Sequence, residues 1–240
     1  SDHGITKLLL GQGCVVYASI LDLQGSVHFA CQQGQKRIVE TFIALGLDIS
    51  LRNNAGDTIL HSACASNDCG VVSILCQFGA DYEIANKAGD TPLHVCCRSG
   101  GTDIAKLLLS IGADPNLKNG CGYTSFEIAV KCGHLNLFSL LCFHRGEEHL
   151  SGLFARIFGV KKETFLHLAA AHGWHKLVKF MIAHGALATA KNVNGNTPLH
   201  LACMNSKPKV VEVLLRENPS LADMANAKGL TPRSMAVQSN

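Results

Sequence analysis

Histidine and cysteine are the side chains of this sequence with the greatest chemical potential. The 240 residues include 12 histidines and 11 cysteines. Both types bind zinc, and a reactive cysteine can also act as a nucleophile or a redox centre. A zinc site needs four such ligands, usually with a close pair among them. Cys132 and His134 form one close pair and His172 and His175 another, but no further local pair completes either set.

The sequence also lacks the motifs of common enzyme classes. It contains no phosphate-binding P-loop, no GxGxxG after a strand, no GxSxG nucleophile elbow and no HExxH zinc motif. A cysteine nucleophile would need an activating base and electropositive surroundings. We therefore predict a chain without catalytic residues, without a bound metal and without a cofactor.

Composition limits the class of protein further. Apolar residues make up 47% of the chain and charged residues only 16%, so the chain can build a core and is not predominantly disordered. No apolar run reaches the roughly 18 residues of a membrane helix, and no signal-peptide pattern opens the sequence. Without a secretory signal the cysteines do not indicate a disulfide framework. We expect an intracellular protein, cytoplasmic or nuclear.

A 33-residue repeat must position these side chains. Histidine recurs at this interval, except that a glutamate stands at the fourth position. Seven extra residues follow that glutamate before the spacing resumes. The positions are His28, His61, His94, Glu127, His167 and His200. The second half of each unit repeats apolar residues at i, i+1, i+4 and i+5, which predicts one apolar face of a helix. The first of these columns consists of Ile38, Val71, Ile104, Leu137, Leu177 and Val210.

Each unit is therefore expected to hold two short helices. Pro92 and Pro198 suit the first turn of a helix, and Thr91 and Thr197 before them can act as N-caps. Small or turn-forming residues between the two helices predict a left-handed backbone at Gly34, Asn67, Gly100, Gly133 and Gly173. Ser206 breaks this column, so a different turn is expected there.

These repeats resemble the ankyrin-repeat family. The resemblance is carried by DTPLHVCCRSGGTDIAKLLLSIGADPNLKN (90–119), DTILHSACASNDCGVVSILCQFGADYEIAN (57–86) and NTPLHLACMNSKPKVVEVLL (196–215), and it extends from about Ile5 to Met235. It implies an all-α fold, a right-handed solenoid of stacked helix-turn-helix units with β-hairpin-like loops. The concave face of such a stack is built from loop tips and first helices.

We predict a single ankyrin-repeat domain over 1–240. Its units are a partial repeat at 1–23, repeats at about 24–56, 57–89, 90–122, 123–162, 163–195 and 196–229, and a partial repeat at 230–240. The fourth repeat contains an insertion at 146–162. Neither end has the polar outer face that a terminal repeat needs, which suggests a piece of a longer repeat protein.

The register gives most histidines and cysteines a structural role. In the family that the sequence resembles, the recurring imidazole forms hydrogen bonds within and between repeats, and His134 and His184 stand where histidine is common. Eight cysteines fall in buried columns as small hydrophobic residues: Cys14, Cys31, Cys64, Cys76, Cys96, Cys97, Cys142 and Cys203. Only Cys69, Cys121 and Cys132 are expected to be exposed.

The insertion carries apolar residues with helical spacing. Leu150, Leu153, Phe154, Ile157 and Phe158 follow the i, i+3, i+4, i+7, i+8 pattern of an amphipathic helix of about two turns. In one interpretation this face packs on the neighbouring repeats. In the other it stays exposed as a docking site for a partner.

The resemblance also implies a contact surface at the loop tips and at the ends of the first helices. Together with the insertion, the candidate partner-binding residues are Asn54, Asp57, Ser66, Lys87, Asp90, Arg98, Ser99, Lys118, Tyr123, Lys131, Phe154, Phe158, His172, Asn194, Asn196, Met204 and Asn205. Asn116 resembles the loop asparagine that oxygen-sensing hydroxylases modify in some family members, which is a separate hypothesis.

Charge is distributed unevenly along the chain. Residues 1–150 carry 10 basic and 14 acidic side chains (net −4), and residues 151–240 carry 11 and 4 (net +7). An acidic partner could therefore bind toward the C-terminal end. The primary hypothesis is a non-enzymatic module, a scaffold that binds a protein or peptide. The alternatives are a structural spacer within a larger protein and a metal- or redox-responsive module. Nucleic-acid binding is disfavoured because, apart from Trp174 and Phe180, the basic residues lack interleaved aromatics.

Overall fold

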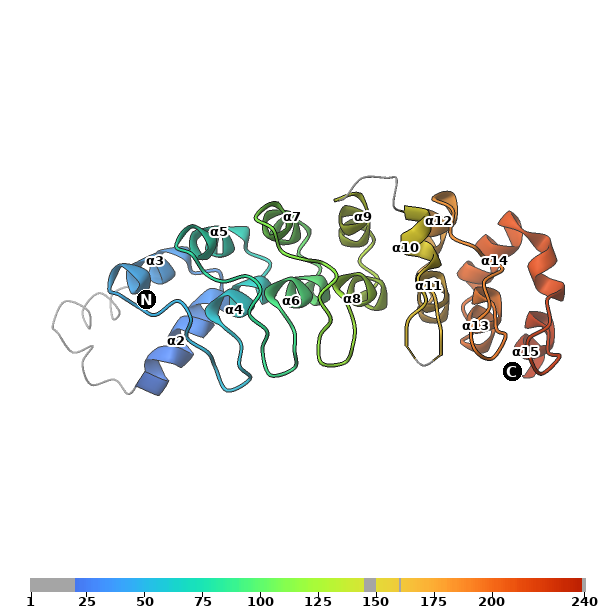
Figure 1. The fold of residues 1–240 in the computed structure, drawn as a ribbon, viewed down its shortest axis with the longest axis horizontal. Coiled ribbons are helices and arrows are strands. Elements are labelled where there is room, and N and C mark those ends of the chain that lie inside the picture. The colour runs from blue at the N-terminus through green and yellow to red at the C-terminus, as the bar shows by residue number, and fades with distance from the viewer. Residues whose placement is uncertain (1–19, 145–149, 160, 239–240) are drawn as a thin grey trace. The chain divides into compact units, whose positions relative to one another are not determined.

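The computed structural model describes residues 20–144, 150–159 and 161–238. The chain divides into two compact units, Ser1–Ala113 and Asp114–Asn240. Each unit consists of helices connected by loops (Figure 1). Among the described residues there is no extended strand, and two isolated bridges pair Arg52 with Thr58 and Phe158 with Glu163. The predicted all-α architecture of helix pairs is confirmed.

The first unit contains three helix pairs. They are α2 (Ile20–Gln32) with α3 (Lys36–Ala44), α4 (Ile59–Ala65) with α5 (Cys69–Gln77), and α6 (Pro92–Ser99) with α7 (Thr102–Ser110). The first helices α2, α4 and α6 contact one another in sequence, and the second helices α3, α5 and α7 form a parallel row. Buried residues such as Val39, Val72 and Ile104 come from the predicted apolar columns and form the core.

The second unit continues the pattern with one addition. Its helices are α8 (Ser125–Cys132), α9 (Leu135–Phe143), α10 (Leu150–Ala155), α11 (Phe165–His172), α12 (His175–Ala183), α13 (Pro198–Met204), α14 (Pro208–Glu217), the 3-10 helix η3 (Pro219–Asp223) and α15 (Pro232–Gln238). Helices α8, α11, α13 and α15 form the row of first helices, and α12 packs on α14. Helix α10 belongs to the insertion and has no counterpart in the first unit.

Helix starts follow the prediction closely. Thr91 and Thr197 are N-caps, and Pro92 and Pro198 occupy the first helical turn. In each of these helices the threonine side chain contacts the backbone of the third helical residue, which is a histidine. The side chain of that histidine in turn contacts the backbone of the threonine. This reciprocal capping box satisfies donors that a helix start otherwise leaves without partners.

The turns between paired helices use a left-handed backbone. Gly100, Gly133 and Gly173 have φ values of 85°, 79° and 88°, as predicted for their column. The expectation of a different turn at Ser206 was wrong, because Ser206 adopts the same region with φ 52°. The hydrogen bond from Lys207 N to Ala202 O closes that turn in the way that the bond from Trp174 N to Ala169 O closes the preceding one. The repeat packing therefore overrides the local preference of serine.

Loop tips of consecutive repeats contact each other through their backbones. In the second unit, Ala227 N donates to Asn194 O at 3.1 Å. Gly195, with φ 72°, lies so close to this contact that an added Cβ would stand 2.5 Å from Ala227 N. Gly229 holds the corresponding place in the next loop with φ 74°, and an added Cβ there would meet nothing within 4 Å.

Gly195→Ala should therefore destabilise the second unit more than Gly229→Ala. Both substitutions incur the conformational cost of a left-handed alanine, about 1–2 kcal/mol. Only Gly195→Ala also pushes against the backbone of the neighbouring loop, so we expect a total loss of about 3 kcal/mol. Urea unfolding of the two variants measures the difference. Equal losses would contradict a close backbone approach at Gly195.

The insertion forms a shorter helix than predicted. Helix α10 ends at Ala155, so Ile157 and Phe158 lie outside it. Phe158 instead pairs with Glu163, with N to O distances of 2.9 Å and 3.1 Å, around a turn in which Gly159 and Lys162 have positive φ. This local turn replaces the second helical turn that the apolar spacing predicted. The acidic residues Glu147 and Glu148 of the predicted helix start lie outside the described residues.

Phenylalanine side chains hold the insertion against the second unit. Phe154 is buried, with its ring centroid 6.3 Å from that of Phe138, and the Phe158 ring lies 5.0 Å from that of Phe165. Phe138, which is fully buried, also contacts the rings of Phe165 and Phe180. The packing interpretation therefore holds for Phe154, which is buried, and in part for Phe158, which is half-buried. Ile157 remains 59% exposed.

Candidate protein-interaction surface

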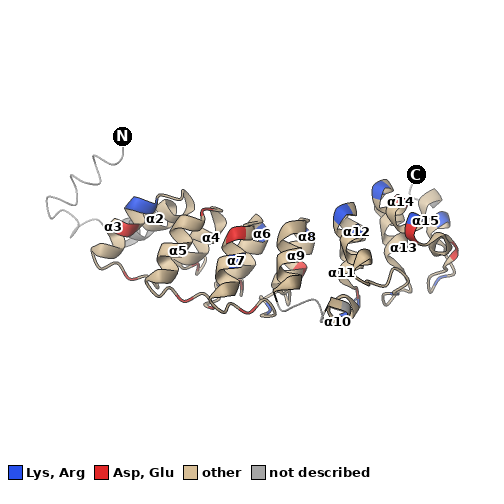
Figure 2. Cartoon of the chain, turned by 90° about the horizontal axis from the view of Figure 1, so that it is seen from above, with Lys and Arg blue, Asp and Glu red and all other residues tan. Residues whose placement is uncertain are grey.

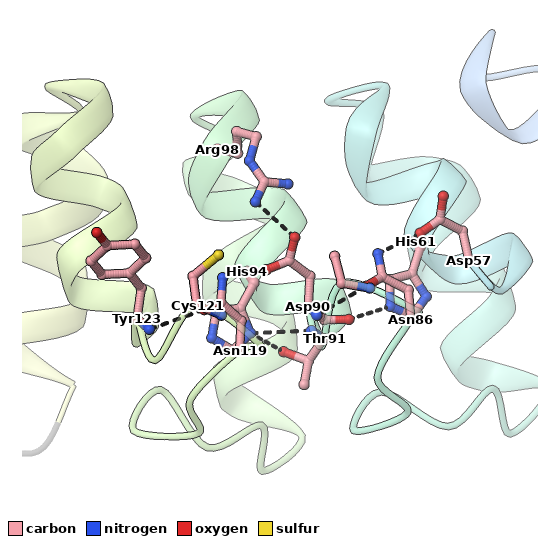
Figure 3. A network of polar contacts seen from close by, with 11 residues as sticks. Asp57, His61, Asn86, Asp90, Thr91, His94, Arg98, Asn119, Cys121 and Tyr123 are labelled. Carbon is pink, nitrogen blue, oxygen red and sulfur yellow. Dashed lines mark hydrogen bonds and ion pairs between the residues drawn. The ribbon is translucent and has the colours of Figure 1, made fainter. Parts of the chain in front are cut away.

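Histidines at the repeated position tie one repeat to the next. The Thr58 backbone N–H donates to His61 Nδ1 at 3.1 Å, so Nε2 carries the proton and donates to Asp90 O at 2.9 Å. Figure 3 shows His61 in this polar network. His167 and His200 make the same contacts to Asn196 O at 3.0 Å and Leu230 O at 3.1 Å. The structural role that the resemblance implied for these three imidazoles is confirmed.

Burial keeps these imidazoles neutral. It lowers the pKa of His61, His167 and His200, partly offset by the hydrogen bond that each donates to a carbonyl. Burial lowers the pKa of His28 as well. His28 Nδ1 lies 2.7 Å from Ser62 Oγ, and its buried Nε2 has no hydrogen-bond partner among the described residues. His184 Nδ1 lies 2.8 Å from Phe180 O.

Half of the described cysteines lie in the hydrophobic core. Burial raises the pKa of the thiols of Cys31, Cys96 and Cys142 to about 12, so thiolate formation there is unfavourable. The expected burial of Cys76 and Cys203 was wrong, since both are half-buried. The expected exposure of Cys69 and Cys132 was also wrong, since both are half-buried. Cys121 is exposed, as predicted; Cys14 lies outside the described residues.

No grouping of three or more histidine, cysteine, aspartate or glutamate side chains in the described part of the chain could hold a metal ion. The pairs Cys132 with His134 and His172 with His175 thus gain no additional ligands there. The described cysteines are all free thiols.

In the first unit the candidate binding residues are engaged with one another. Asn86 Nδ2 donates to Asp57 Oδ1 at 2.7 Å, and Arg98 Nη2 lies 2.7 Å from Asp90 Oδ2 (Figure 3). The Lys87 ammonium donates to Asn54 O at 2.8 Å across adjacent loops. The Lys87 contact joins neighbouring repeats and the other two lie within a repeat. A partner would therefore have to compete for groups that are already bonded.

Three candidate residues lie where a partner could not reach them. The relative exposure of Asp90 and Phe154 is 3%, and that of Asn196 is 6%. The Asp90 carboxylate is bonded to Arg98, and Asn196 Oδ1 accepts a hydrogen bond from Asn226. Phe154 is covered by the ring packing described above. Their inclusion as surface residues is corrected accordingly. Of the other candidates, Asn54, Lys87, Arg98, Lys118, His172, Asn194, Met204 and Asn205 are exposed, whereas Asp57, Ser66, Ser99, Tyr123, Lys131 and Phe158 are half-buried.

A group of aromatic and cationic side chains lies at the inter-helix turns of the second unit. The Lys131 ammonium stands 3.9 Å from the centre of the Tyr123 ring, a cation–π contact. The Trp174 indole covers Gly133, and the Lys207 side chain covers Gly173. The positive charges of Lys131 and Lys207 both help to lower the pKa of His172, after the larger effect of burial. We call Tyr123, Lys131, His172, Trp174 and Lys207 the turn surface.

Sequence reasoning missed Trp174 as a component of this surface. It is the single tryptophan of the chain and is 38% exposed. The sequence did contain a signal for this role, because Trp174 directly follows the turn glycine Gly173 and lies two residues after His172. What the repeat register did not show is that its indole reaches back over the turn of the preceding repeat.

The second unit is also the basic part of the chain. Residues 114–240 carry 14 basic and 8 acidic side chains (net +6), whereas residues 1–113 carry 7 and 10 (net −3). Figure 2 shows lysine and arginine segments on α12, α14 and α15. The excess of positive charge therefore coincides with the unit that carries the turn surface.

Asn116 is held by hydrogen bonds on both sides of its amide. Its Oδ1 accepts from Arg156 Nη1 at 3.1 Å, and its Nδ2 donates to Asp114 Oδ1 at 3.0 Å. The side chain is half-buried. Hydroxylation of Asn116 stays a hypothesis, and it would require the Arg156 contact to open.

Comparison with known proteins shows which family shares this architecture. The family profile described as "Ankyrin repeats (3 copies)" matches residues 27–119 and 126–225. Rabankyrin-5 of Mus musculus is 31% identical over 75 residues, which are 31% of this chain and 6% of that protein. An ankyrin repeat-containing protein of Arabidopsis thaliana is 37% identical over 62 residues, 25% of this chain and 12% of that protein. The chain therefore spans only a small part of these relatives.

Solved structures agree at the level of the fold. The human ASB11 ankyrin repeat domain matches with a TM-score of 0.74 and 26% identity, covering 88% of this chain and 90% of that one. The ankyrin repeat domain of Bcl-3, a member of the IkappaB protein family, matches with a TM-score of 0.68 and 24% identity, covering 88% and 92%. No helix among the described residues is long and apolar enough to cross a membrane. With the repeat hydrogen bonds and the profile match over most of its length, this chain belongs to the ankyrin-repeat family.

Proposed function

We propose that this chain is a non-enzymatic protein-interaction module that uses the turn surface of its second unit to bind an acidic protein or peptide. Ankyrin repeats in general bind proteins, which supports the class of function. The observation that carries the choice of surface is the exposed Trp174 at an inter-helix turn, in the same unit as the turn cations Lys131 and Lys207. Tryptophan, tyrosine and arginine dominate the binding energy of protein interfaces, and cations favour an acidic partner.

Two further parts of the proposal, the absence of catalysis and the cellular compartment, are argued from the cysteines. Buried thiols with raised pKa values are poor nucleophiles, which supports a role without catalysis. Free thiols throughout the described residues suit a reducing compartment. We therefore assign this role to the cytoplasm or the nucleus.

Trp174→Ala should abolish most partner binding while leaving the fold intact. We expect a loss of at least about 2 kcal/mol in binding, roughly a 30-fold weaker affinity, because Trp174 is the largest exposed anchor of the surface. The test compares proteins retained from a lysate of the source cells by immobilised wild type and variant, followed by titration of each retained protein. Circular dichroism checks that the variant remains folded.

Leu187→Ala is the matched control, because Leu187 is 66% exposed in the same unit but lies outside the turn surface. The double substitution Lys131→Glu and Lys207→Glu should also abolish binding of an acidic partner. Equal retention by wild type, Trp174→Ala and the charge-reversed variant would contradict the proposal and favour a structural spacer.

A further inference from the structure

The insertion creates two cavities that meet at Arg156. The apolar cavity, about 410 Å³, lies between α8, α9 and α10 and is lined mainly by Phe126, Leu141, Cys142, Leu150 and Leu153. The charged cavity, about 260 Å³, is lined by Lys118, Glu127, Arg156, Phe158 and Lys162 among others. Arg156 lines both. All of these residues belong to the second unit.

The charged cavity lies where the regular contact between repeats is interrupted. His167 and His200 each donate a proton to a backbone carbonyl of the following loop. Glu127 holds the equivalent position, and an ionised carboxylate has no proton to donate. Its Oε2 accepts from the Thr124 backbone N–H at 2.6 Å and from the Thr124 hydroxyl. The carboxylate thus caps its own helix, as the histidines do, but cannot donate to the loop that follows.

The insertion replaces that following loop. Phe158 N donates to Glu163 O at 2.9 Å across its turn, and Ile157 is 59% exposed at the cavity edge. The interruption therefore combines a changed residue at the repeated position with a changed loop beyond it. Within the described part of the chain only this repeat combines the two features; in the last, partial repeat Ser234 takes the repeated position, and its Oγ accepts from Thr231 N at 3.0 Å.

The balance of charge around the cavities is positive. Lys118, Arg156 and Lys162 are cationic, and Glu127 is the single acidic residue that lines either cavity. Among the described residues none of the three cations forms a salt bridge, although the charges of Arg156 and Lys118 act on the Glu127 carboxylate. Arg156 donates to the neutral amide oxygen of Asn116, which fixes its position without cancelling its charge. An occupant that carries a carboxylate would therefore be attracted to this edge.

We propose that the insertion builds a recognition site for a short peptide segment in which an apolar side chain stands close to an aspartate or glutamate. The apolar side chain enters the cavity beneath Leu150 and Leu153. The carboxylate meets Arg156, Lys118 and Lys162. Arg156 selects the spacing between the two groups because it lies at the boundary of both cavities. This site is separate from the turn surface and does not depend on it.

Synthetic peptides can test this site directly. The probes are capped, glycine- and serine-based peptides that contain one leucine and one glutamate, placed adjacent or separated by one or two glycines. Amide shifts in NMR spectra of the whole chain report binding. We expect at least one spacing to shift the amides of Leu153 and Phe158 with a dissociation constant of about 0.1–1 mM, which is typical of so small a ligand.

Substitutions in the peptide and the protein should weaken this binding selectively. Replacing the peptide's glutamate by glutamine, or its leucine by serine, should weaken binding at least fivefold. In the protein, Lys162→Gln should weaken it about threefold, as expected for one partly exposed ion pair, and Arg156→Gln should weaken it about tenfold. Lys161→Gln is the matched control, because Lys161 is exposed next to Lys162 and lines neither cavity.

The remaining outcomes would overturn the proposal. They are the absence of shifts with every spacing, equal effects of Lys161→Gln and Lys162→Gln, or shifts that follow protein concentration instead of peptide, which would mean that a second copy covers the site. Trp174→Ala should leave peptide binding unchanged. Failure of this site therefore differs from failure of the turn surface, which Trp174→Ala tests.

Discussion

Phe138→Ala should lower the free energy of unfolding of the second unit by about 3–5 kcal/mol, the largest loss expected from a single truncation in this chain. Phe138 is fully buried, and its ring contacts those of Phe126, Phe154, Phe165 and Phe180. Removing the ring leaves a cavity that these rigid neighbours can fill only in part. The loss should appear as a lower urea midpoint for the second unit.

Hydrogen exchange can assign the loss to the correct region. Because repeat proteins gain stability from contacts between neighbouring units, protection should fall first in α9, α10 and α11. Phe78→Ala provides the control, since Phe78 is 57% exposed, and its truncation should cost well under 1 kcal/mol. A loss below about 1 kcal/mol for Phe138→Ala would show that the phenylalanine rings do not form a tight core.

Acidification should destabilise the chain well before its carboxylates titrate. Folding lowers the pKa of His28, His61, His167 and His200 below the ordinary value of 6.5, mainly through burial. Below pH 6.5 the unfolded state therefore binds more protons than the folded state. The stability that these histidines contribute is fully present above about pH 6.5 and is lost as the pH falls from there toward their lower folded pKa values.

The size of this effect has an upper limit. At about pH 5.5 each histidine can cost at most about 1.4 kcal/mol relative to neutral pH. Glu127 acts in the opposite sense, because burial raises its pKa above 4.5 and its contribution is present at low pH and lost as the pH rises through its folded pKa. Four histidines outweigh one carboxyl in the range from pH 7.5 to about 5.5, so the net change there is a loss.

Urea unfolding at several pH values measures this dependence. His61→Gln and His167→Gln should each be less stable than wild type at neutral pH but should show a weaker pH dependence. His144→Gln is the control, because His144 is exposed. A wild-type stability that stays constant from pH 7.5 to about 5.5 would contradict neutral, buried imidazoles.

The sequence predicted those parts of the structure that repeat. The helix pairs and the threonine caps follow from spacing and residue type, and the hydrogen bonds of the recurring histidines follow from the family resemblance, because every repeat packs in the same way. The insertion was predicted less well. Its apolar spacing matched a longer helix, but Phe158 reaches Phe165 from an extended backbone. Periodicity cannot separate these two ways of burying the same side chain.

The candidate surface was predicted in outline only. The ends of the first helices were identified, yet Asp90 and Asn196 turned out to be buried, because the repeat register does not show their side-chain contacts with Arg98 and Asn226. Trp174 was overlooked for a related reason. Its position over Gly133 depends on how one repeat stacks on the next, and a single repeat considered alone contains no such information.

The place of Trp174 has a consequence for spectroscopy. Because the chain has no other tryptophan, its indole fluorescence reports on one contact between repeats, where Trp174 covers Gly133. Partial exposure makes that emission sensitive to collisional quenchers, and the ammonium groups of Lys131 and Lys207 would enrich iodide over caesium around it. The native chain thus carries a built-in optical probe for the separation of two consecutive repeats, without any attached dye.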